Sequence, residues 1–228
     1  MSDGVLAKSS ERLAEQVAAY AGPRAVQCKT RMNEANIEVQ SWPVHSQYSA
    51  QKEAAKLVDE IDLNATDVVY CYGVGLGYVY DALTKWLQGD VGRFLVFLED
   101  EESVLQALLE TERGRTLWCD PQVHVTFIGK QEAEREITLQ SLAQYFVGTR
   151  LKVTALPSYA QRKDRLWQQI QMILMHKSTL INFASQEFLR CGATFFRNFY
   201  RNVWALQDSY NAAGLFGKFK GIPAIIAG

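Results

Sequence analysis

A series of short apolar runs that alternate with helical stretches constrains the fold of this sequence most strongly. Val68–Tyr72 is continuously apolar and Arg93–Leu98 is a second run; Val123–Ile128 is expected to be a third strand and Leu151–Ala155 a fourth. The helical stretches Tyr78–Leu87 and Glu101–Glu112 separate the first three. A strand that is apolar on both faces needs cover on both faces, which is typical of a parallel sheet between helices. The pattern therefore predicts an α/β fold with a Rossmann-like, mostly parallel sheet over residues 63–156.

Other patterns flank this core. Residues 1–62 predict a helix at 4–21, a small hairpin from the runs 25–30 and 36–42, and a helix capped by Ser49. Residues 157–220 keep helical spacing, so we expect a linking segment of two or three helices there. Residues 221–228 are apolar, and we expect them to be the first strand of a following domain that the sequence leaves incomplete.

Composition excludes several classes of protein. The apolar share of 48% allows a well-buried core, and the four cysteines are too far apart for a metal cluster. No run of about 18 apolar residues occurs, and the first residues lack a signal-peptide pattern. We therefore expect a cytoplasmic protein with no metal site and no membrane partner. The aromatic-rich stretch 195–202 at helical spacing predicts core packing, and the pI of about 6.3 argues against a nucleic-acid partner.

Charge is distributed unevenly along the chain. Residues 1–150 carry 14 basic and 22 acidic side chains, whereas residues 151–228 carry 10 and 3, within totals of 24 and 25. The two parts can dock on each other, or the basic part can face an acidic or phosphorylated partner.

The most informative motif is Gly73-Val74-Gly75-Leu76-Gly77, between a predicted buried strand and a helix. Glycines there permit a tight turn and let a ligand approach the helix N-terminus. The dinucleotide fingerprint needs a further glycine at position 78, which is Tyr78. The spacing is instead similar to the first motif of S-adenosylmethionine-dependent methyltransferases, although Cys71 stands where those enzymes usually have an acidic residue. Gly73, Gly75 and Gly77 are candidate cofactor-binding residues, and the identity of any cofactor stays unknown.

Glu99 is the fourth candidate in this group. It ends the second strand, where ribose-binding carboxylates occur in such folds. It also opens the run Glu99-Asp100-Glu101-Glu102, which would repel phosphates and is ordinary at a helix start, with Asp100 as the expected N-cap. Both interpretations, ribose ligand and helix start, stay open.

No catalytic constellation can be assembled from the sequence. The three histidines, His45, His124 and His176, are scattered, and none pairs with a nearby cysteine or serine in a known arrangement. We therefore assign no catalytic residue and interpret the histidines as structural.

Several pieces together resemble the motility accessory factor family of bacterial proteins associated with flagellin glycosylation. They are Val44-His45-Ser46-Gln47-Tyr48 followed by Glu53-Ala54, the loop Tyr72–Tyr78, Asn198 and Asn202, and Gly221–Gly228. Their order and approximate spacing match the family over most of the chain.

The resemblance implies a parent glycosyltransferase that transfers a nonulosonic acid from its CMP-activated form to flagellin or another acceptor protein. It implies that the catalytic domain follows Gly228, so this chain is a non-catalytic N-terminal module for acceptor recognition or assembly, with a nucleoside or nucleotide sugar as the candidate ligand. Two alternatives are a methyltransferase-like domain and, from a related branch, an enzyme similar to 6-hydroxymethylpterin diphosphokinase. No phosphate-cradling lysine supports the latter.

Overall fold

The structure is a computed structural model of the 228-residue chain. It describes Leu13, Glu15, Val17, residues 19–129, 131–145 and 150–208, and Gly217, Lys218, Lys220 and Gly221. The chain divides into two compact units, Met1–Asn182 and Phe183–Gly228. The strand expected at residues 221–228 lies outside the described residues except for Gly221, as does most of the helix expected at 4–21.

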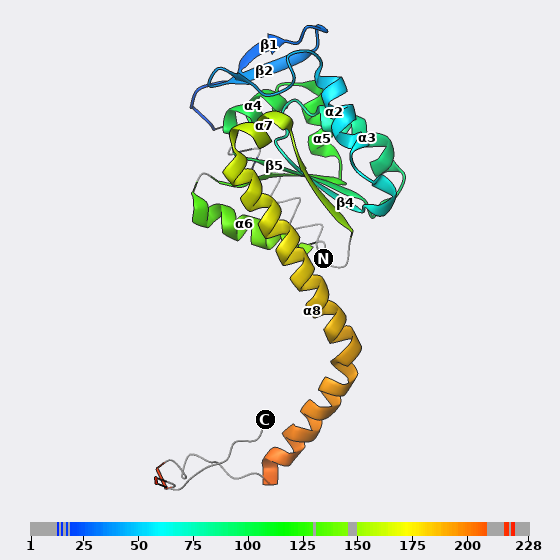
Figure 1. Cartoon of the computed structure of the whole chain (residues 1–228), viewed down its shortest axis with the longest axis vertical. Helices are drawn as coiled ribbons and strands as arrows, with labels where there is room; N and C mark the ends of the chain where they lie inside the picture. Colours follow the sequence, from blue (N-terminus) through cyan, green and yellow to red (C-terminus); the bar gives the residue numbers. More distant parts are fainter. Residues whose placement is uncertain are drawn as a thin grey trace. The chain divides into compact units, whose positions relative to one another are not determined.

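A four-stranded parallel sheet forms the centre of the first unit (Figure 1). Its strands are β4 (Val68–Tyr72), β5 (Phe94–Glu99), β6 (Val123–Phe127) and β7 (Leu151–Ala155). Every residue of β4 is buried, as are all but the first of β5. Strands buried on both faces are what the continuous apolar runs predict, so the expected α/β class is confirmed.

The strand order β6-β5-β4-β7 places a topological switch point in the middle of this sheet. β4 pairs in parallel with β5 on one side and with β7 on the other. In open α/β sheets, ligands bind outside the carboxyl ends of the strands where the order reverses. The segments that follow β4 and β7 are therefore the place to look for a site.

A second, antiparallel sheet precedes the core. It joins β1 (Val26–Lys29), β2 (Ala35–Val39) and β3 (Trp42–Pro43) in that order. The sequence predicts a two-stranded hairpin here, and the structure adds the short third strand. Gln40 and Ser41 both have positive φ, at 48° and 67°, so the turn between β2 and β3 is tight enough to leave only two residues between the strands.

The helices around the sheet match the prediction in part. α2 (Ala50–Asp59) is capped as expected, because the Ser49 hydroxyl accepts the Lys52 N–H at 3.1 Å, and α3 (Tyr78–Gln88) follows the glycine loop. The helix expected over about 101–112 is α4 (Glu102–Leu109), which ends three residues earlier than expected, and a second helix, α5 (Glu112–Cys119), was not predicted. The expected N-cap Asp100 is wrong. Glu101 takes that position. α6 (Glu132–Tyr145) was not predicted at all.

After the sheet the chain is helical, as expected. α7 (Pro157–Arg162) follows β7 directly, with Pro157 in the first turn, and α8 (Asp164–Ala205) runs from the first unit into the second before a short 3-10 turn, η2 (Leu206–Asp208). A 3-10 turn η1 (Leu63–Ala65) precedes β4. The domain boundaries at residues 62, 156 and 220 stay predictions. Within the described part of the chain, no helix is both long and apolar enough to cross a membrane.

Candidate functional site

The glycine loop lies at the switch point, between β4 and α3, as the sequence predicts. All three glycines adopt positive φ, at 88° for Gly73, 52° for Gly75 and 79° for Gly77. Side chains with a β-carbon rarely adopt these backbone angles. The alternating glycines therefore allow the sharp path of the chain, with Gly77 as the N-cap of α3.

Side chains of the same chain fill the space in front of the loop. A β-carbon on Gly73 would lie 2.7 Å from Cδ2 of the Tyr159 ring, and one on Gly77 would lie 2.9 Å from Cδ of Arg113. A β-carbon on Gly75 would overlap the His45 ring at Nε2 and Cε1. Close approach of a ligand is the usual reason for such glycines, and here protein side chains make that approach.

Four of the five N–H groups of the loop have partners within the protein. The Val74 N–H donates to Glu99 Oε2 at 3.1 Å, and the Leu76 N–H donates to His45 Nε2 at 2.9 Å. Gly73 and Gly77 donate to backbone carbonyls, at 2.8 Å and 3.1 Å. In a nucleotide site such donors face phosphate or ribose oxygens. In this loop an imidazole and a carboxylate take those positions.

Glu99 is fully buried beneath the loop. Its carboxylate accepts the N–H groups of Val74, Asp100 and Glu101, and it accepts the Tyr159 hydroxyl, which lies 2.9 Å from both oxygens. Burial, aided by the Asp100 charge, raises the pKa of Glu99 to about 8, against the opposing effect of the N–H donors. The structure thus brings Glu99 together with the loop, and Glu99 also supports the backbone at the start of α4.

Lys163 neutralises the rest of the acidic run. Its ammonium lies 2.7 Å from Asp100 Oδ2 and 2.6 Å from Glu101 Oε1. The Tyr72 hydroxyl donates to the other oxygen of Asp100 at 3.2 Å. Attraction to both carboxylates raises the pKa of Lys163, although burial opposes this shift. The sequence gives no sign of this pairing, because 62 residues separate Lys163 from Glu101.

His45 lies against the glycine loop, a contact that the sequence analysis did not predict. Its ring is buried, and its backbone is held by the Asn36 side chain, whose amide donates to the His45 carbonyl at 3.0 Å and accepts the His45 N–H at 3.1 Å. Because Nε2 accepts the Leu76 N–H, a neutral ring carries its proton on Nδ1, which lies 3.4 Å from Glu53 Oε1. The pairing of His45 with Glu53, eight residues later on α2, is the signal that could have found it.

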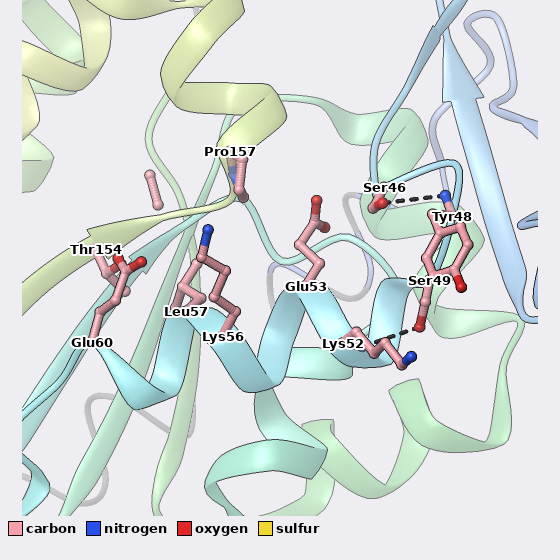
Figure 2. Close-up of a pocket in the computed structure, with 11 residues that line it drawn as sticks. Ser46, Tyr48, Ser49, Lys52, Glu53, Lys56, Leu57, Glu60, Thr154 and Pro157 are labelled. Atoms are coloured by element: carbon pink, nitrogen blue, oxygen red, sulfur yellow. Dashed lines mark hydrogen bonds between the residues drawn. The ribbon is translucent and has the colours of Figure 1, made fainter.

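An open pocket of about 400 Å³ lies beside the closed loop (Figure 2). Thr154, Ala155 and Pro157 form one wall at the carboxyl end of β7, and residues of α2 form the other. Figure 2 shows Lys56 and Glu53 extending from α2 toward Pro157. Lysine, glutamate and hydroxyl groups alternate along the lining, so the pocket has no single charge sign, and within the described residues no cluster of ligands suits a metal ion.

Comparisons with known proteins give only distant structural likeness. No family model matches the chain, and no curated protein matches it. A Maf glycosyltransferase from Magnetospirillum magneticum AMB-1 has a similar structure at 13% identity and a TM-score of 0.49, covering 75% of this chain and 35% of its own. MnmC2 from Aquifex aeolicus has 14% identity and a TM-score of 0.38, covering 56% and 50%. This chain thus spans about a third of the first protein's length and half of the second's.

Proposed function

We propose that the first unit is a non-catalytic Rossmann-like module of a motility-accessory-factor-type protein glycosyltransferase, serving acceptor recognition or assembly. The observation that carries this proposal is the closed glycine loop. His45 and Tyr159 occupy the space in front of Gly75 and Gly73, and Glu99 accepts the N–H that a ligand would otherwise bind. The loop therefore has a structural role: it connects β4 to α3 and holds both against the segment that follows the antiparallel sheet.

Three of the pieces on which the family resemblance rests are in contact in the folded chain. His45 belongs to the Val44–Tyr48 piece, and its Nε2 accepts the N–H of Leu76 in the glycine-loop piece. Glu53, the next piece, lies against His45 Nδ1. Residues that must fit one another physically are more informative together than each short motif alone. This contact supports the assignment, and flagellin or a similar acceptor protein is the partner that the assignment implies.

Ligand binding by the purified chain tests the proposal. We expect isothermal titration calorimetry to give no heat with S-adenosylmethionine, CMP or a CMP-activated nonulosonic acid at concentrations up to a millimolar. We also expect no sugar transfer to purified flagellin from the CMP-sugar. A positive control that binds each compound under the same conditions shows that the ligands are intact.

The rival function is a nucleoside-binding enzyme of the methyltransferase type. It is favoured by the position of Glu99, which ends β5 beside the glycine loop, where a ribose-binding carboxylate would lie. In that case S-adenosylmethionine should bind and Glu99→Ala should abolish binding, whereas Glu60→Ala in the neighbouring pocket should not. Micromolar binding with this dependence on Glu99 would overturn the scaffold proposal.

A further inference from the structure

The second unit carries a concentrated apolar surface on α8 that none of the described residues covers. Its side chains recur three, four and seven residues apart, so they share one side of the helix. Their exposed fractions range from 42% for Val203 to 81% for Leu189. We call this surface the aromatic face; it comprises Phe188, Leu189, Phe195, Phe196, Phe199, Tyr200, Val203 and Trp204.

The opposite side of the same segment is polar. Arg190, Arg197 and Arg201 lie there with Thr194 and Asn198. This separation shows that the aromatic face is not the result of a uniformly apolar sequence. Large exposed apolar patches with a polar rim mark interaction surfaces.

The aromatic face contains a notch as well as projections. Gly192 lies four residues after Phe188 and four before Phe196, and those two rings approach edge to face at 6.1 Å between centroids. Gly192 is buried beneath its neighbours, yet a β-carbon added there would meet nothing within 4 Å. The missing side chain thus leaves a space beneath the two rings, and an incoming side chain reaches it by displacing them, as a knob enters a hole in paired helices.

The area of the aromatic face matches that of a stable dimer. Aromatic side chains bury about 150–250 Å² each, so the exposed fractions above correspond to roughly 900 Å² of apolar surface per copy. Standard protein interfaces bury roughly 800 Å² per partner. A second copy supplies the same area and the same projections and notch.

We propose that the aromatic face is the interface of a homodimer in which α8 pairs in antiparallel orientation with α8 of a second copy. With the two-fold axis between residues 195 and 196, Phe199 of each copy lies opposite Gly192 of the other, where it displaces the Phe188 and Phe196 rings and fills the notch beneath them. Such an interface is isologous, since each contact occurs twice. This inference does not depend on the proposed function, because it uses only residues 183–206.

The mass of the chain in solution tests the dimer. Sedimentation velocity at about 50 µM should give twice the 25.8 kDa of one chain, with dissociation on dilution. The double variant Phe195→Asp/Phe199→Asp should sediment as a monomer, and the control Thr194→Asp/Asn198→Asp, with the same added charge on the polar side, should remain a dimer. A monomeric wild type would overturn the inference, and the aromatic face would then be covered by residues 209–228 or by a lipid surface. A dimeric Phe195→Asp/Phe199→Asp variant would also overturn it.

Two further variants test the notch and the orientation. Gly192→Leu should weaken association at least tenfold, because its side chain fills the notch. The far-ultraviolet circular dichroism should stay helical, because the β-carbon meets no atom within 4 Å and leucine is a better helix former than glycine. With Cys28, Cys119 and Cys191 replaced by serine, Gly192→Cys/Phe199→Cys should form an intermolecular disulfide on oxidation. Neither cysteine alone should do so, since like positions lie about 10 Å apart along the antiparallel pair. Efficient cross-linking by either single cysteine would overturn the antiparallel arrangement, and unchanged association of Gly192→Leu would overturn the role of the notch.

Discussion

Replacing Gly75 tests the closed loop most directly, because a single added β-carbon lowers the free energy of unfolding in two separate ways. Gly75→Ala places a β-carbon at φ +52° and against the His45 ring. The left-handed backbone costs about 1–2 kcal/mol for a residue with a β-carbon. Displacing the buried imidazole leaves the Leu76 N–H without its acceptor, which costs about 1–3 kcal/mol more. We therefore expect a loss of about 2–5 kcal/mol in the free energy of unfolding, and Gly75→Val should lose at least as much.

A double-mutant cycle separates the two penalties. In a His45→Ala background the ring is gone, so Gly75→Ala should cost only the backbone term of about 1–2 kcal/mol. Urea denaturation of the four proteins, followed by circular dichroism, gives the coupling energy between residues 45 and 75, which we expect to be about 1–3 kcal/mol. Gly92→Ala is the matched control, because Gly92 is exposed and has no positive φ, and its effect should stay within about 0.5 kcal/mol. Additive effects, or an unchanged melting temperature of Gly75→Val, would refute the reasoning.

Three further predictions concern the surroundings of the loop and the end of the chain. The pKa of Glu99 is raised to about 8 from an ordinary value of 4.5, so the stability that its protonated form contributes is complete below about pH 4.5 and is lost as the pH rises through 8. The wild type should therefore lose stability between pH 5 and 8 relative to Glu99→Gln. A constant difference between the urea midpoints of the two proteins over this range would contradict this prediction. Lys163→Met should cost about 1–3 kcal/mol by leaving Asp100 and Glu101 unpaired, measured by the same denaturation against Lys152→Met on β7, which should change little. Removal of residues 221–228 should leave the melting temperature nearly unchanged, and a large loss would show that this segment belongs to the first unit.

The local pattern of the sequence accounts for the elements that were predicted correctly. β4 and β5 are apolar runs because both of their faces are buried, and the Ser49 cap marks the start of α2 in the sequence. The break between α4 and α5 depends on a weaker signal. The Thr111 hydroxyl accepts the Gly114 N–H at 2.9 Å, and a β-carbon on Gly114 would overlap the Leu108 carbonyl. α6 escaped prediction because its sequence, EAEREITLQSLAQY, has little apolar periodicity.

The position of the candidate site could be predicted from the sequence, but the closure of its loop by other side chains could not. Gly73, Gly75, Gly77 and Glu99 do lie together, since strand ends at a switch point must meet. The residues that fill the loop come from far away in the chain. His45 precedes Leu76 by 31 residues, and Tyr159 follows Glu99 by 60. A motif of five residues contains no information about side chains that fold over it from other elements.

The closed loop changes what a ligand would have to do in order to bind. A nucleoside at this position must displace the His45 ring from the Leu76 N–H and the Tyr159 hydroxyl from Glu99, and both groups are buried. Each buried polar group left without a partner costs about 1–3 kcal/mol, so opening the loop lowers the affinity by roughly one to four powers of ten before the ligand makes any contact. The open pocket beside α2 carries no such cost. If this unit binds a small molecule at all, the balance of these terms therefore favours the pocket lined by Lys56 and Glu53 over the glycine loop.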